Sequence, residues 1–366
     1  MTKKPNTVPG WCPVLLAWFY THKRALPWRD HPEPYRVWVS EIMLQQTRVA
    51  TVEPYFKRFI ARFPTIDALA QAPLHSVLKV WEGLGYYSRA RNLHKAARKL
   101  VRDHHGKLPS DVKALRKLPG IGEYTAGAVA SIAFNRPEPA IDGNVLRVLA
   151  RLKAEKRNVR SSQVRCDFSR LVRYALLAIQ DRSAFNQGLM ELGAGICTPQ
   201  KPACPLCPVQ DWCQAFKLGL TTTLPARPRR KPVPQYTIAV GLVLHEGRIL
   251  IAQRSPEQML GGLWEFPGGK KEPGESLEQT VLREVHEEVG IEVEAEKKLC
   301  TVKHAYSHFR ITLTAFLCRY VSGTVTETHT DQPIRWVHPE ELHEYPFPRA
   351  NQKIIEALLQ QPQGST

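Results

Sequence analysis

The chain has 366 residues, enough for two domains at roughly 100–200 residues each, and its 43% hydrophobic content suits proteins with buried cores. Its formal net charge of +17 favours a polyanionic partner, with a solvated basic surface as the alternative. No apolar run reaches the ~20 residues that span a bilayer, and no apolar segment follows residues 1–5 as in a signal peptide. We therefore expect a cytoplasmic protein that binds nucleic acid.

The first predicted elements are helices. Apolar residues recur at helical spacing in residues 14–19, 37–44 and 171–179. Pro and Gly residues, such as those at 119–122, separate these stretches as turns. The pattern predicts an all-α domain that occupies residues 11–195 and ends in a cysteine-rich segment.

An acidic residue, Glu41, lies in the otherwise apolar stretch 37–44. Burial disfavours a charged carboxylate, so a buried Glu41 would keep its proton near neutral pH and could act as a general acid. The alternative is a structural glutamate whose hydrogen bonds are satisfied.

A glycine pair, Gly120 and Gly122, marks a tight turn where the backbone can approach another molecule closely. A helix is predicted to follow from about Tyr124, and its free N–H groups could hold a phosphate. An ordinary corner between two helices would show the same glycines. About twenty residues further on, Asp142 precedes Gly143; in isolation such an aspartate is usually a turn or N-cap residue.

Four of the eight cysteines lie within 197–213 and follow the spacing Cys-x6-Cys-x2-Cys-x5-Cys. Four thiolates can close around one zinc ion or one [4Fe–4S] cluster, and the spacing alone leaves both open. This clustering favours a metal site in a reducing compartment over disulfides. The four are Cys197, Cys204, Cys207 and Cys213. The others, which we expect to be small buried apolar residues, are Cys12, Cys166, Cys300 and Cys318.

The segment 216–235 is basic and rich in proline, which predicts an exposed, semi-rigid linker. Strands are then predicted at 237–244 and 248–252, a helix at 276–289, and further strands around 300–320. The second domain, residues 236–362, is therefore predicted to be α+β.

Residues 269–291 carry the pattern Gly-x5-Glu-x7-Arg-Glu-U-x-Glu-Glu-x-Gly-U, in which U is aliphatic. Three of its carboxylates, Glu284, Glu287 and Glu288, lie on one predicted helix and can hold Mg²⁺ against a diphosphate. A solvated acidic helix is the alternative, but it would not also explain Gly269.

Taken together, the motifs of residues 11–215 closely resemble the MutY family of helix–hairpin–helix DNA glycosylases. The resemblance implies an all-α glycosylase domain over residues 8–215, with a [4Fe–4S] cluster in the loop 197–213, as in endonuclease III. It implies excision of adenine mispaired with 8-oxoguanine or guanine in double-stranded DNA, as a step of base excision repair. It also implies a monomeric, cytoplasmic protein of bacterial type, associated with the nucleoid.

The same resemblance assigns roles to single residues. Glu41 would protonate adenine at N7, and Asp142 would stay ionised beside the oxocarbenium-like sugar. Glycosylase-lyases of this superfamily carry a lysine where this chain has Tyr124, so the resemblance implies a monofunctional enzyme in which water completes the reaction. Gln46 and Tyr86 match residues that insert beside 8-oxoguanine and into the base stack. The other positions that match DNA or adenine contacts are Arg29, Gly120, Gly122, Asn144 and Gln187.

The second domain resembles the Nudix fold of MutT-type 8-oxo-dGTP pyrophosphatases. MutY proteins use such a domain to recognise 8-oxoguanine, usually with a decayed catalytic box, whereas the box of this chain is intact. Tyr306, Ser307 and His308 match the lesion-contacting loop, although the family usually has Phe at position 306. Asn351 matches the residue that recognises the oxidised base.

Three alternatives stand beside a monofunctional glycosylase. The intact box leaves open an added hydrolysis of 8-oxo-dGTP with Mg²⁺. A pyrophosphatase with a DNA-binding helical domain is disfavoured, because the glycosylase pattern is complete over the longer domain. An idle iron–sulfur DNA-binding module is disfavoured by the presence of both Glu41 and Asp142.

Overall fold

The computed structural model describes residues 8–30, 32–226, 232–255, 257–306, 308–325 and 333–360. The chain divides into two compact units. The first comprises residues 1–71 and 92–230, and the second comprises residues 72–91 and 231–366.

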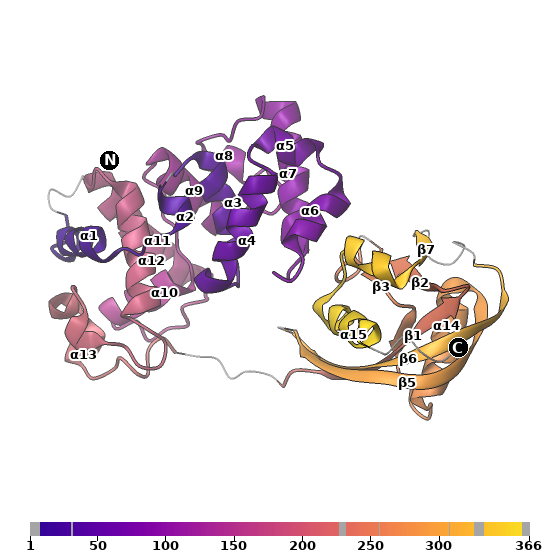
Figure 1. The fold of residues 1–366 in the computed structure, drawn as a ribbon. Helices are drawn as coiled ribbons and strands as arrows, with labels where there is room; N and C mark the ends of the chain where they lie inside the picture. Colours follow the sequence, from indigo (N-terminus) through magenta and orange to yellow (C-terminus); the bar gives the residue numbers. More distant parts are fainter. Residues whose placement is uncertain are drawn as a thin grey trace. The chain divides into compact units, whose positions relative to one another are not determined.

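The described part of the first unit is built from helices (Figure 1). The helices from the N-terminus to the hairpin are α1 (Trp11–His22), α2 (Pro27–Asp30), α3 (Pro34–Leu44), α4 (Val49–Arg62), α5 (Ile66–Gln71), α7 (Ser88–His104) and α8 (Val112–Leu115). They are followed by α9 (Glu123–Phe134), α10 (Gly143–Leu152), α11 (Ser162–Ala178), α12 (Arg182–Gly195) and α13 (Gln214–Lys217). The helix α6 (Leu74–Trp81) and the first turn of α7 belong to the second unit.

A buried apolar core joins helices that are far apart in sequence. Leu15 of α1 packs with Leu149 of α10 and with Phe185 and Leu189 of α12, and all four side chains are 0% exposed. Burial of such apolar faces stabilises helices more than intrinsic propensity does. The predicted all-α first domain is confirmed.

The described part of the second unit contains one mixed sheet of seven strands. Its strands are β1 (Gln235–His245), β2 (Arg248–Gln253), β3 (Trp264–Glu265), β4 (Gly268–Lys270), β5 (Ile291–Ala305), β6 (Arg310–Gly323) and β7 (Ile334–Val337). Their order is β3-β2-β1-β6-β5, with β4 paired to β1 and β7 to β2. The pair β1–β6 is parallel, and the other pairs are antiparallel.

Two helices cover the two faces of this sheet: α14 (Leu277–Val289) and α15 (Arg349–Leu359). Strand side chains alternate between faces, so Ala239 and Val243 pack toward α14 while Val240 and Leu242 pack toward α15. A glycine stands at position 241 because an added Cβ would lie 3.0 Å from Val281 of α14. The predicted strands, helix and α+β class are confirmed.

Candidate active site

A cavity of about 1140 Å³ lies in the first unit. It is lined by the segment before α3, by α3 itself, by the first turns of α9 and α10, and by α12. Eight predicted site residues line it: Arg29, Glu41, Gln46, Gly122, Tyr124, Asp142, Asn144 and Gln187. Tertiary folding therefore brings residues more than 150 positions apart in sequence to one site.

Glu41 lies on α3 and is only 6% exposed. Tyr124, in the first turn of α9, donates its phenolic hydrogen to Glu41 Oε2 across 2.7 Å. Burial raises the pKa of Glu41 from 4.5 to about 7; the Tyr124 hydrogen bond and the charge of Arg29 oppose this rise, and the charge of Asp142 adds to it. The expected rise in this pKa is confirmed, and a carboxyl group of this kind can deliver a proton near neutral pH.

Asp142 is the N-cap of α10, so the N-cap role that its sequence context suggests is confirmed. Its Oδ1 accepts a hydrogen bond from Val145 N at 2.7 Å, and its Oδ2 accepts one from Asn144 Nδ2 at 2.9 Å. Burial raises the pKa of Asp142, whereas these donors and the nearby Arg147 favour the ionised form. These hydrogen bonds fix the orientation of the Asp142 carboxylate at the cavity.

A charged network also lines the pocket. Arg29 Nε donates to Gln187 Oε1 at 2.9 Å, and Arg29 Nη2 pairs with Glu191 Oε2 at 2.7 Å. Arg24 also pairs with Glu191, which is 5% exposed. Sequence reasoning missed Arg24 and Glu191, although an acidic residue within the apolar run Leu189–Leu192 is the same signal that singled out Glu41.

The hairpin glycines adopt the expected tight geometry. Gly120 has φ of +76°, and an added Cβ would lie 2.7 Å from Asn92 Cβ. Gly122, which has no side chain, is the N-cap of α9. Gln46 has a left-handed φ of 59°, and Tyr86 one of 51°. Tyr86 belongs to the second unit and is not among the residues that line the cavity.

The four clustered cysteines line one small cavity of about 30 Å³. Arg151 on α10 donates to Cys197 Sγ at 3.3 Å. In the described ranges no three His, Cys, Asp or Glu side chains converge closely enough to hold a single metal ion. Four thiols that share a cavity without converging on one point suit a multi-iron cluster better than one tetrahedral ion.

The other cysteines follow the prediction only in part. Cys12 and Cys318 are buried and Cys300 is half-buried, but Cys166 is exposed. The prediction for Cys166 is wrong because it lies on the outer face of α11, where its neighbours Arg165 and Asp167 are also at the surface.

The acidic box of the second unit lies around α14. Arg283 pairs with Glu284 at 3.0 Å and with the largely exposed Glu287 at 2.9 Å. Gly268 N donates to Glu288 Oε2 at 2.9 Å, and the pKa of Glu288 rises to about 8 through burial and then through the charge of Glu265. The three predicted Mg²⁺ ligands therefore do not converge on one point among the described residues.

The predicted lesion-contacting residues surround the end of β5. Tyr306 stacks on Phe309 with ring centroids 4.7 Å apart, and His308 is exposed. Ser307 lies outside the described residues. Asn351 is 7% exposed in the first turn of α15.

Three protein families match parts of the chain. The HhH-GPD superfamily base excision DNA repair protein family matches residues 39–173, the iron–sulfur binding domain of endonuclease III matches 197–213, and the NUDIX domain matches 239–357. The first range contains Glu41 and Asp142, and the second contains the four clustered cysteines.

Individual proteins are similar over most of the chain. An adenine DNA glycosylase of Homo sapiens is 34% identical over 408 residues, which cover 96% of this chain and 74% of that protein. One from Buchnera aphidicola subsp. Schizaphis graminum is 32% identical, with 94% and 97% covered. The solved structure of a thermostable thymine-DNA glycosylase is 27% identical with a TM-score of 0.52, and covers 57% of this chain and 95% of that chain.

The helical fold and these matches define a base excision DNA repair glycosylase that carries an iron–sulfur binding domain and ends in a Nudix domain. The chain belongs to the adenine DNA glycosylase family. The predicted family and enzyme class are thereby confirmed. Within the described residues, no helix is both long and apolar enough to cross a bilayer.

Proposed function

We propose that this protein is a monofunctional adenine DNA glycosylase that excises adenine mispaired with 8-oxoguanine or guanine in duplex DNA. The observation that carries the proposal is a pair of unlike carboxyl groups in one cavity. Burial raises the pKa of Glu41 to about 7, whereas the rise that burial gives the pKa of Asp142 is opposed by hydrogen-bond donors that favour its anion. Two carboxyl groups in different environments are what the cleavage of a glycosidic bond requires.

In the proposed reaction Glu41 gives its proton to adenine N7. The C1′–N9 bond then breaks with its electrons staying on the base, and the Asp142 carboxylate stabilises the positive charge on the sugar. Water attacks C1′ and loses a proton to the Glu41 carboxylate, which restores the acid. Tyr124 has no amine with which to form a Schiff base, so the DNA strand stays intact.

Recognition of the flipped adenine is assigned to Arg29, Asn144 and Gln187, whose polar groups line the cavity and suit the edge of a purine. Gln46 and Tyr86 are proposed to enter the base stack. Both hold a left-handed backbone that is unfavourable for residues other than glycine, and such strain concentrates at functional positions.

A [4Fe–4S] cluster is proposed to bind Cys197, Cys204, Cys207 and Cys213. When bound, it would cross-link the loop through four thiolate bonds. Purified protein should be brown and contain about four irons per chain, as four thiolates around one cubane require. Colourless protein with a single zinc would contradict this assignment.

We assign catalysis to residues 8–215, a linker to 216–235 and lesion recognition to 236–362. Tyr306, Ser307, His308 and Asn351 would contact 8-oxoguanine. Replacing both Ser307 and His308 by Ala should then reduce the discrimination between A:8-oxoguanine and A:G by about 1–3 kcal/mol, the scale of one base-specific contact.

The deciding experiment is single-turnover excision from A:8-oxoguanine, A:G and A:T duplexes. Wild type should release adenine from the first two. Glu41→Gln and Asp142→Asn should each lose about 10²–10⁴ in rate, the usual effect of acid–base help, while duplex binding is retained. Near-normal excision by either variant would rule out its role.

Hydrolysis of 8-oxo-dGTP is a second candidate function, favoured by the crowding of Glu265, Glu284 and Glu288. Burial, and then the charges of Glu265 and Glu284, raise the pKa of Glu288, and a bound divalent cation would relieve the repulsion among these carboxylates. Wild type with Mg²⁺ should release pyrophosphate, and Glu287→Gln or Glu288→Gln should eliminate the release. Absence of release from wild type would reject this activity and leave adenine excision untouched.

A further inference from the structure

The part of the chain up to residue 235 and the part after it carry opposite net charges. Residues 236–366 contain 13 Lys and Arg against 18 Asp and Glu, a net charge of −5, whereas residues 1–235 contain 38 against 16, a net charge of +22. The attraction of the chain to a polyanion therefore comes from its first part. The second part as a whole repels DNA, so any basic patch on it needs a local explanation.

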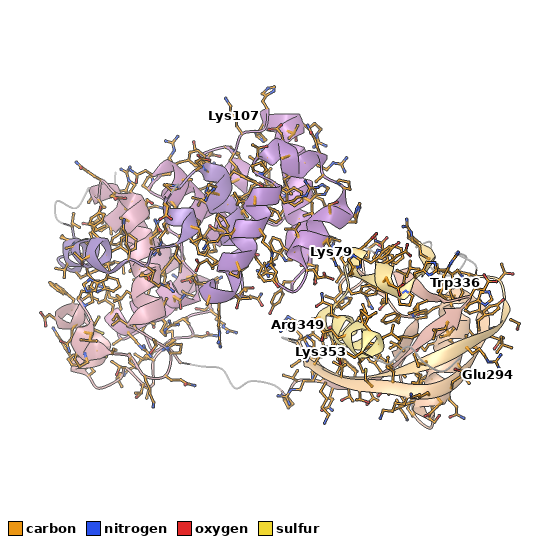
Figure 2. The ribbon with its side chains drawn as sticks, in the orientation of Figure 1. Lys79, Lys107, Glu294, Trp336, Arg349 and Lys353 are labelled. Atoms are coloured by element: carbon orange, nitrogen blue, oxygen red, sulfur yellow. The ribbon has the colours of Figure 1, made fainter. Side chains whose placement is uncertain are left out.

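Such a patch lies where β5 and α15 meet. It consists of His304, Arg349 and Lys353, and we call it the β5–α15 patch. Lys303 and Arg310 line a cavity of about 330 Å³ on the other face of the sheet, because side chains alternate along each strand and Val302 and Ile311 pack toward α15. Arg349 and Lys353 are four positions apart on α15, so they share one helix face, and Figure 2 shows both beside α15.

The charges of this patch are not neutralised by nearby carboxylates. Within the described ranges, no ion pair joins Arg349 or Lys353 to an acidic side chain. Other arginines of the unit are paired, among them Arg254 with Glu265 and Arg319 with Glu294. Burial lowers the pKa of His304, and the positive charges of Arg349 and Lys353 lower it further.

We propose that the β5–α15 patch binds backbone phosphates of the duplex next to the lesion-contacting loop. The loop begins where the patch ends, because Tyr306 directly follows β5 and its ring lies 4.6 Å from the ring of His304. Phosphate contacts carry no sequence information, but they set the register of a protein on DNA. The patch would thus hold the loop over one position of the strand, which extends the lesion recognition proposed above.

The test compares two double substitutions in the full-length, cluster-containing protein. Arg349→Gln with Lys353→Gln removes two patch charges, and Lys297→Gln with Lys298→Gln removes two exposed charges elsewhere on β5. Kd is measured from 50 to 300 mM NaCl on a duplex with 2′-fluoro-2′-deoxyadenosine opposite 8-oxoguanine. That nucleotide resists base loss because fluorine destabilises the oxocarbenium-like sugar.

The patch variant should lower the magnitude of the slope of log K against log salt by about 1.8, as expected for two phosphates at about 0.9 each. The control variant should change it by less than about 0.5, and so should Arg310→Gln, because Arg310 lies on the other face of the sheet. Equal slope changes in the patch and control variants, or none in the patch variant, would overturn the proposal. An unchanged slope with weakened 8-oxo-dGTP binding would also overturn it, in favour of a free-nucleotide site.

The outcome is separable from that of the proposed function. Patch variants should keep the wild-type ratio of affinities for A:8-oxoguanine and A:G, because phosphates do not distinguish the two pairs. If wild type shows no preference between these pairs, lesion recognition fails, and the salt slopes still decide whether the patch contacts the DNA backbone.

Discussion

Tyr124 donates a hydrogen bond to Glu41 across 2.7 Å, and this bond opposes the rise in the pKa of the proposed catalytic acid. The two residues are 83 positions apart, one on α3 and the other in the first turn of α9. The phenol stabilises the carboxylate form of Glu41, which forms when the acid gives up its proton. Tyr124 therefore adjusts the acidity of Glu41.

Tyr124→Phe should shift the alkaline limb of the excision rate to higher pH. Loss of the donor raises the pKa of Glu41, so the acid stays protonated over a wider range. The expected displacement is about 0.5–1 pH units, equivalent to a net hydrogen bond of about 1 kcal/mol. Single-turnover rates between pH 5 and 9 measure it, with Tyr20→Phe at an exposed hydrogen-bonded tyrosine as the control. A limb that stays in place or moves to lower pH would contradict the assignment.

Glu191→Gln should displace the same limb in the opposite direction. Glu191 neutralises Arg24 and Arg29, and the charge of Arg29 lowers the pKa of Glu41. Without this counter-charge Arg29 acts more strongly, and the limb should fall by up to about 1 pH unit. Glu138→Gln, which breaks an ion pair with Arg173 outside the cavity, should leave the limb in place. A purely structural Glu191 would reduce the rate equally at every pH.

Glu41→Gln should make the protein more stable in alkaline buffer. The folded state raises the pKa of Glu41 from 4.5 to about 7, so it binds the proton more tightly than the unfolded state does. This contributes stability below pH 4.5 that is lost as the pH rises through 7, and the full difference is about 3 kcal/mol. Denaturant unfolding should show the variant gaining stability over wild type at pH 8 but not at pH 4.5. An equal difference at both pH values would show that ionisation of Glu41 is not its source.

Gly127→Ala should destabilise the helical unit by about 1–3 kcal/mol, the usual cost of overpacking. An added Cβ at Gly127 on α9 would lie 2.1 Å from the backbone oxygen of Pro139, which leads into the segment carrying Asp142. Gly195→Ala is the matched control, because no atom lies within 4 Å of an added Cβ there. Thermal unfolding of both variants decides the matter. Similar melting temperatures would mean that α9 and residue 139 can separate without cost.

Local features could be predicted from sequence because their causes are local. The four cysteines fall within 197–213, so one short loop carries them all, and the helix predicted at 276–289 lies at Leu277–Val289. The exposure of a single side chain could not be predicted in this way. Cys166 was expected to be buried, but the orientation of α11 against the core leaves it at the surface.

What only the tertiary structure decided is the electrostatic environment of the site. Sequence singled out Glu41 by its apolar neighbours, but its pKa depends on burial and on Tyr124, Asp142 and Arg29, which come from three different segments. Glu191 is 162 positions from the Arg29 that it neutralises. Strand β1 pairs in parallel with β6, although Gln235 and its partner Arg310 are far apart in the sequence. Helical periodicity and clustered ligands follow from the order of residues along the chain. Charge–charge energies and desolvation depend on distances in space, and those distances exist only once the chain has folded.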